Sequence, residues 1–77
     1  MSDLSPLDAR VLAATSRDAE RTAERIGEPA GCYADAALSA LRRLRLRYLV
    51  ENDGRRRPAR WLRTHPGDIE LGVDDGA

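Results

Sequence analysis

The stretch ENDGRRRPARW, residues 51–61, holds the residue types whose chemistry stands out most in this sequence. It places four arginines around an Asp-Gly pair, which is a strong turn signal. A guanidinium group presents several N–H donors in a fixed fork, which suits phosphate oxygens and the edge of guanine. These residues therefore indicate binding of a polyanion at a turn rather than catalysis.

Charge is distributed unevenly along the chain, although the formal net charge is zero. Residues 1–41 hold four arginines and seven acids, residues 42–63 hold nine arginines and two acids, and residues 64–77 hold four acids and no arginine. The middle block is thus +7 between acidic blocks of −3 and −4. A local excess of positive charge of this size predicts a polyanionic partner, which the net charge alone would argue against.

Residues for catalysis or metal binding are scarce. The chain has one cysteine, Cys32, and one histidine, His65. It therefore offers no internal disulfide, no nucleophile–base pair and no spacing of metal ligands. We expect no enzymatic activity, no metal, no cofactor and no small-molecule ligand.

Targeting signals are also not evident. No apolar run approaches the roughly 18 residues that a membrane span needs. The N-terminal residues MSDLSPLDAR are acidic and do not follow the charged-then-apolar pattern of a signal peptide. We expect a cytoplasmic protein without a membrane partner.

Two helices are predicted in the first half of the chain. Ser5 followed by Pro6 is a capping residue before a proline, which predicts a helix over residues 5–15. An apolar stripe at i, i+3, i+4 and i+7 predicts a second helix over residues 16–27. Gly27 is expected to end this helix, because glycine is a common C-terminal stop, and Pro29 in the breaker GEPAG (27–31) is expected to prevent any continuation.

A third helix and a hairpin are predicted next. Apolar residues at helical spacing indicate a helix from residue 33, and around Arg47 the pattern changes to that of a strand. Short apolar runs at 49–50 and 61–62 flank the Asp-Gly turn and predict a β-hairpin. The expected fold is mostly α with a small β-hairpin. Residues 1–64 form the domain, and residues 65–77 form an acidic, flexible tail.

This order of elements resembles the winged helix-turn-helix family of DNA-binding domains. The residues that carry the resemblance are AERTAERIG (19–27), ALSALRRLRLRYLVE (37–51) and DGRRRPARW (53–61). The passage Leu41-x-x-Leu44 followed by Leu49-Val50 is similar to the corresponding passage in MarR-type and ArsR-type repressors. The sequence departs from the family in three ways. Tyr48 stands where the family usually has glycine, and the stretch between Gly27 and Leu41 is about four residues longer than usual. Asp35 also places a carboxylate, which repels phosphate, near the start of the third helix.

The resemblance implies a three-helix winged helix-turn-helix with its third helix in the major groove of double-stranded DNA. It implies a sequence-specific, repressor-like transcriptional regulator that acts as a homodimer, because one small domain covers a single half-site. The small size is typical of a regulator from a phage or mobile element. The candidate DNA-binding residues are Tyr33, Asp35, Ser39, Arg42 and Arg43 on the helix, and Arg55, Arg56, Arg57 and Arg60 on the wing.

Three of the singled-out side chains have a second interpretation. Asp35 can accept a hydrogen bond from a cytosine amino group, or it can stabilise the start of a helix through the helix dipole. Tyr33 can contact phosphate or lie at the edge of the core. Trp61 can stack on a partner, but a chain without phenylalanine needs a large core residue, which favours burial.

A second function of a different class also fits the sequence. The acidic flanks and Asp35 are compatible with a winged-helix module that binds another protein and no DNA. Binding to a DNA duplex at several salt concentrations separates the two, because phosphate contacts make affinity depend steeply on salt.

Overall fold

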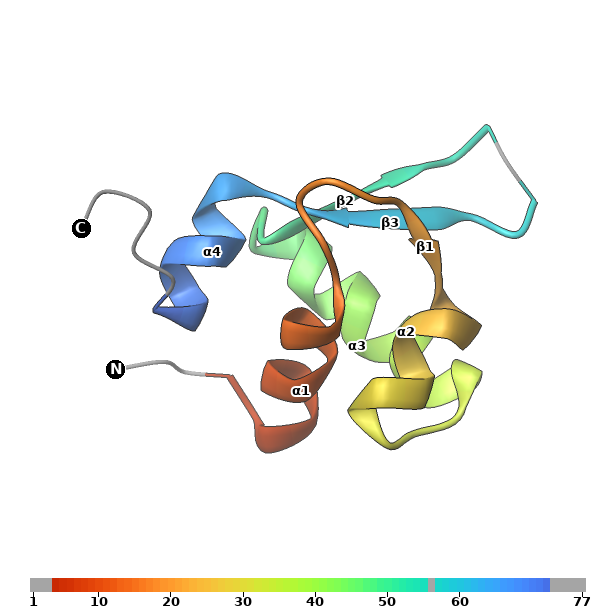
Figure 1. Cartoon of the computed structure of the whole chain (residues 1–77), viewed down its shortest axis with the longest axis horizontal. Coiled ribbons are helices and arrows are strands. Elements are labelled where there is room, and N and C mark those ends of the chain that lie inside the picture. Colours follow the sequence, from red (N-terminus) through yellow and green to blue (C-terminus); the bar gives the residue numbers. More distant parts are fainter. Residues whose placement is uncertain (1–3, 56, 73–77) are drawn as a thin grey trace.

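A computed structural model gives the fold of the chain and describes residues 4–55 and 57–72 (Figure 1). The elements are α1 (Pro6–Ala14), β1 (Arg21–Thr22), α2 (Ala23–Ala30), α3 (Ala34–Leu46), β2 (Val50–Asp53), β3 (Arg60–Arg63) and α4 (His65–Leu71). The strands form an antiparallel sheet in the order β1-β3-β2. The predicted class, mostly helical with a small hairpin, is confirmed at this level. In addition to the predicted hairpin of β2 and β3, the sheet contains β1, which pairs with β3.

Helix α1 begins as the sequence predicts. The backbone N–H of Asp8 donates to Ser5 Oγ over 3.1 Å, and Pro6 occupies the first helical position, where no N–H is needed. Val11 and Leu12 are fully buried on the inner face of this helix.

The predicted helix over residues 16–27 is wrong in its first part. Ser16 Oγ accepts hydrogen bonds from the N–H groups of Asp18 and Ala19, which gives the backbone a local alternative to helical bonding. The chain then pairs Arg21 with Trp61 and Thr22 with Arg60, as strand β1 against β3. Helix α2 begins only afterwards, at Ala23.

The predicted stop at Gly27 is also wrong, because α2 continues through both Gly27 and Pro29 to Ala30. Gly27 is needed for packing inside the helix, since a Cβ there would lie 2.7 Å from the carbonyl oxygen of Cys32. Pro29 lies inside the helix, which therefore lacks the hydrogen bond that an N–H at this position would donate. The helix ends at Gly31, whose φ of 75° places it in the left-handed region that favours glycine.

Helix α3 ends in a turn that has an unusual backbone conformation. The N–H of Leu49 donates to Leu44 O over 3.1 Å, which closes the turn between α3 and β2. Tyr48, at the centre of this turn, has a φ of 62°. A bulky side chain rarely adopts this conformation. It is the position where the resembled family usually has glycine.

The expected flexible tail is corrected over residues 65–71, which form α4. Thr64 caps this helix by accepting the N–H of Gly67 over 3.1 Å. Asp68 is buried between two arginines: its Oδ2 lies 2.8 Å from Arg17, and its Oδ1 lies 2.7 Å from Arg63. The folded unit therefore extends past residue 64. The last part of the predicted tail, residues 73–77, lies outside the described residues.

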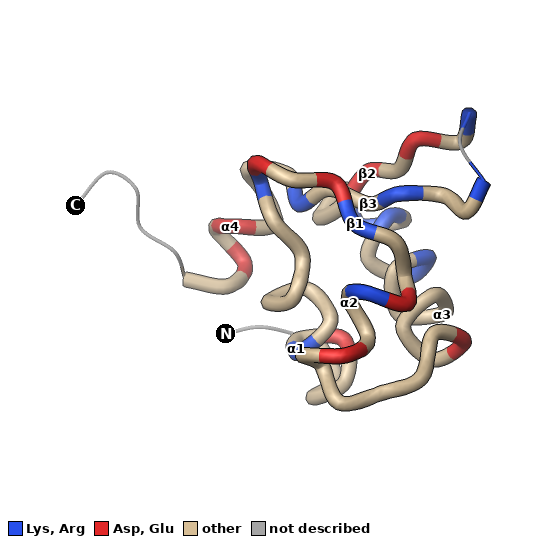
Figure 2. The backbone as a smooth tube through the Cα atoms, turned by 45° about the vertical axis from the view of Figure 1, so that its right-hand side comes forward, with Lys and Arg blue, Asp and Glu red and all other residues tan. Residues whose placement is uncertain are grey.

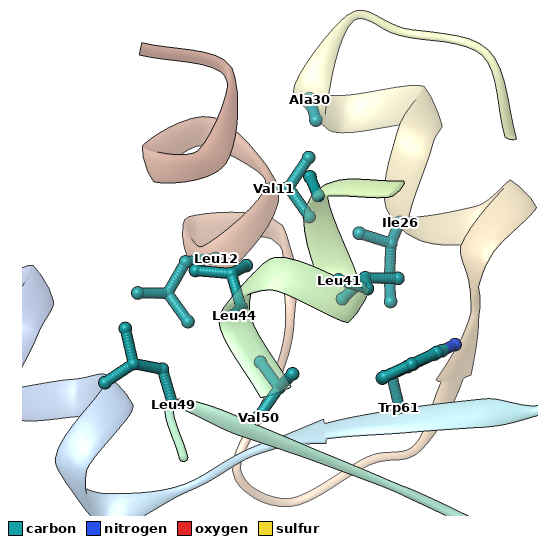
Figure 3. Packing of buried hydrophobic residues seen from close by; sticks show 10 residues of the cluster. Val11, Leu12, Ile26, Ala30, Leu41, Leu44, Leu49, Val50 and Trp61 are labelled. Carbon is teal, nitrogen blue, oxygen red and sulfur yellow. The ribbon is translucent and has the colours of Figure 1, made fainter. Parts of the chain in front are cut away.

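The core lies between the helices and one face of the sheet (Figure 3). Trp61 on β3 is 3% exposed, which confirms the prediction that it belongs to the core. Leu41 and Leu44 on α3 are fully buried against it and against α1 and α2. The described residues include no helix that is long and apolar enough to cross a membrane.

Candidate nucleic-acid interface

Helix α3 has one buried and one exposed face. Ala37, Ala40, Leu41 and Leu44 are buried and fix the rotation of the helix on the core. The opposite face is exposed and follows the helical spacing i, i+4, i+7 and i+11. Its side chains are Asp35, Ser39, Arg42 and Leu46.

A groove of about 530 Å³ lies between this helix and the hairpin. Arg42 and Arg45 line it from α3, and Arg57 lines it from the β2–β3 loop. Trp61 and Leu38 form an apolar part of the wall, and the N-terminal end of α2 contributes Thr22, Ala23 and Glu24. The hairpin extends beyond the helices (Figure 1).

Three arginines of the basic block are neutralised by acids from outside that block. Arg43 forms a fork on Asp8, with Nη2 2.6 Å from Oδ1 and Nε 3.1 Å from Oδ2. Arg47 lies 3.3 Å from Glu70 Oε1, and Arg63 lies 2.7 Å from Asp68. All three pairs join α3 or β3 to α1 or α4, away from the groove.

The other described arginines of the basic block form no ion pair with any carboxylate in the described part of the chain. These are Arg42 and Arg45 on α3 and Arg55, Arg57 and Arg60 on the hairpin. Figure 2 shows this charge on α3 and at the end of the hairpin, whereas α4 is marked by acids. The fold therefore separates the arginines by surface. Those near α1 and α4 are paired, whereas Arg42, Arg45 and Arg57 around the groove form no ion pair within the described residues.

The ion pair between Asp8 and Arg43 also affects protonation. The hydrogen bonds from the Arg43 guanidinium hold the pKa of the Asp8 carboxyl below its ordinary value of 3.8, against the opposing effect of burial. Asp8 therefore stays ionised at neutral pH and keeps Arg43 oriented toward α1. Arg43, predicted as a DNA-binding residue, has its guanidinium engaged within the protein.

The remaining predicted residues lie in different places. Asp35, Arg42 and Arg57 line the groove, and Ser39 lies on the same exposed face of α3. Tyr33 precedes α3, is 90% exposed and lines a separate hollow next to Cys32, so it is not at the edge of the core. Asp35 occupies the first turn of α3, whose N-cap residue provides no side-chain hydrogen bond.

The remaining arginines to place are Arg60 and Arg56 of the hairpin and Arg45 of α3. Arg60 lines a polar hollow with Arg21 and Arg25, on a different side of the sheet from the groove. Arg56 lies outside the described residues. Sequence reasoning missed Arg45, although its position three residues after Arg42 could have identified it as a neighbour on the same helix surface.

No family model, curated protein or solved structure matches this chain. Among the described residues there is also no group of three or more His, Cys, Asp or Glu side chains that could hold a metal ion.

Proposed function

We propose that the protein binds double-stranded DNA, with α3 in the major groove and the β2–β3 hairpin as a wing on the flanking backbone. The observation that carries this proposal is the groove in which Arg42, Arg45 and Arg57 converge without carboxylate partners among the described residues. No hydrogen bond or ion pair within residues 4–55 and 57–72 engages these guanidinium groups, and phosphates are the partners that such a cluster attracts.

The exposed face of α3 has dimensions and chemistry that suit base recognition. The major groove is about 12 Å wide and admits one α-helix. Arg42 can form a fork to guanine O6 and N7 from this face, and Ser39, one turn earlier, can bond to base or phosphate. Arg45 lies closer to the hairpin, where the DNA backbone would pass.

The hairpin supplies a second set of contacts. Arg55 and Arg57 are exposed in the loop between β2 and β3. Arginines at such a position can lie along phosphates or enter a narrow minor groove, where the negative potential is strongest. Trp61 on β3 attaches the hairpin to the helices, because its side chain is buried in the core.

The biological role follows from the resemblance of the helices and the hairpin to winged helix-turn-helix repressors. We propose a cytoplasmic, sequence-specific transcriptional regulator of repressor type, of the size found in phages and mobile elements, and no enzyme. One copy would cover one half-site, so that two copies would bind together.

Duplex binding at increasing salt concentration tests this function. Wild-type protein should bind a pool of random duplexes at low salt and lose affinity steeply as salt rises. Arg57→Ala should lower the slope of log affinity against log salt by about one, because one phosphate contact is lost. Arg47→Ala is the matched control, since Arg47 pairs with Glu70 away from the groove.

Two results would contradict the proposal. One is the absence of any duplex binding at low salt, which would favour a protein-binding module instead. The other is an equal effect of Arg47→Ala and Arg57→Ala, which would mean that the groove has no special part in binding.

A further inference from the structure

Tyr48 combines a strained backbone conformation with an exposed side chain. Its backbone has a φ of 62°, a conformation that is costly for a bulky side chain. The side chain nevertheless remains 79% exposed, so that it gains little from burial. Within the described chain its ring makes no hydrogen bond. Glycine would satisfy this turn more easily, which indicates that the tyrosine has another use.

A second exposed apolar residue lies beside it. Leu46, at the end of α3, is 81% exposed, and together with Tyr48 it lines a hollow of about 400 Å³. We call this surface the Tyr48 patch; its residues are Arg45, Leu46, Tyr48, Val50, Glu51 and Asn52. Two large apolar side chains next to one another on a surface are typical of an interaction site.

The patch includes the open edge of the sheet. Among the described strands β2 pairs only with β3, so its other edge has backbone N–H and C=O groups without a strand partner. An edge of this kind can add a strand from another chain.

The charges of the patch make it complementary to itself. Arg45 and Glu51 have opposite signs, and neither forms an ion pair within the described residues. A two-fold axis through the patch would bring each arginine toward the glutamate of the other copy. In such an arrangement the same surface serves both partners.

The patch lies apart from the tip of the hairpin. It is formed where α3 joins β2, at the base of the hairpin (Figure 1). Arg45 lines both surfaces, so a second copy on the patch would engage it, whereas Arg42 and Arg57 line the groove and do not belong to the patch.

We propose that the Tyr48 patch is the contact surface for a second copy of this chain. A stable interface takes about 20–30 residues from each side, whereas this patch has six, so we expect a weak dimer that forms only at high protein concentration. This inference does not depend on DNA binding, because the dimer forms from the protein alone.

Sedimentation velocity over a range of protein concentrations tests the proposal without DNA. Wild type should shift from the 8.5 kDa monomer toward twice that mass as concentration rises. Leu46→Glu should remain monomeric throughout. Ile69→Glu is the matched control, because Ile69 is exposed on α4 outside the patch, and it should dimerise like wild type.

Tyr48→Gly separates loss of the interface from loss of the fold. It should raise the melting temperature of the monomer, because glycine adopts the positive φ without strain, and at the same time abolish dimerisation. The charge reversal Glu51→Arg should weaken the dimer, and Arg45→Glu in the same chain should restore it.

Three results would overturn the proposal. A wild-type protein that is monomeric at all concentrations would show that a second copy is not the occupant of the patch. A dimer that persists in Leu46→Glu and Tyr48→Gly would place the interface elsewhere. Equal loss of the dimer in Ile69→Glu would show that the effect is not specific to this surface.

Discussion

At the scale of single residues, the arginines of the basic block differ in what they can do although they look alike in sequence. Arg42 and Arg43 are neighbours, yet Arg43 is held by Asp8 and Arg42 lines the groove. Sequence reasoning could not separate them, because the deciding carboxylate lies 35 residues away on α1. Trp61 was predictable, since a core without phenylalanine needs one large apolar residue and no other tryptophan is available.

Tyr48 gives a residue-scale prediction about stability. Replacing Tyr48 by glycine should raise the free energy of unfolding by about 1 kcal/mol, because it relieves the cost of a non-glycine residue at positive φ. Tyr48→Ala keeps a Cβ in the same conformation and should leave stability nearly unchanged. Urea unfolding of the three proteins measures the difference. Equal stabilisation by alanine and glycine would show that the backbone is not the cause.

A second residue-scale prediction concerns the groove. Arg42→Ala should weaken binding to a selected duplex by about 1–3 kcal/mol if Arg42 contacts guanine, and relax the preference at that one base pair. Arg45→Ala should weaken binding to all sequences to a similar extent. Fluorescence anisotropy with a set of single-base variants of the duplex distinguishes the two. A uniform effect of Arg42→Ala across all variants would contradict base reading by this residue.

At the scale of elements, long periodic segments were predictable and short ones were not. Helices α1 and α3 follow their apolar spacing. Strand β1 has two residues and exists only because β3 pairs with it, and α4 has seven residues whose stability comes from contacts. The two residues of β1 carry no strand signal of their own. Helix α4 does have local signals, a capping Thr64 at its start and Gly72 at its end, but they stand in a short acidic segment that the sequence predicts to be a flexible tail. The end of α2 is set locally, because Gly31 adopts the left-handed conformation that glycine favours.

The attachment of α4 predicts a dependence of stability on pH. Hydrogen bonding from Arg17 lowers the pKa of Asp68 below 3.8, and Arg43 lowers that of Asp8 in the same way. Because both folded-state pKa values are lowered, the stabilisation is present above the unfolded value and is lost as pH falls below about 4. The urea concentration at the unfolding midpoint should therefore fall as the pH is lowered from 7 to 3. The fall should be smaller in Asp68→Asn than in wild type, because the variant has no carboxyl group to protonate at this position. An unchanged pH profile in that variant would contradict the role of Asp68.

The close packing of α4 on the turn before β2 gives a further prediction. A Cβ at Gly67 would overlap the carbonyl oxygen of Leu49 and lie 2.7 Å from Cγ of Arg63. Gly67→Ala should therefore destabilise the fold by about 1–3 kcal/mol. Gly54→Ala is the control, because a Cβ at Gly54 meets nothing within 4 Å. Thermal unfolding followed by circular dichroism measures both, and equal melting temperatures would show that α4 packs loosely.

At the scale of the whole molecule, the net charge of zero hides a separation of charge by surface. The acids of α1 and α4 neutralise arginines on one side, and the groove between α3 and the hairpin keeps its arginines unpaired within the described chain. The charge block along the sequence predicts a polyanionic partner for the arginines of the groove. The sequence did not predict that the acidic flanks would neutralise part of the block itself, since that depends on which elements meet in space.

The central claim is that double-stranded DNA binds in the groove between α3 and the hairpin. Titration of ¹⁵N-labelled protein with a short duplex, followed by amide chemical shifts, tests it residue by residue. We expect the amide shift changes to concentrate on Asp35, Ser39, Arg42 and Arg57 and their neighbours. The amide shifts of α1 and α4 should change little. Shifts centred on α4, or none at low salt, would contradict it.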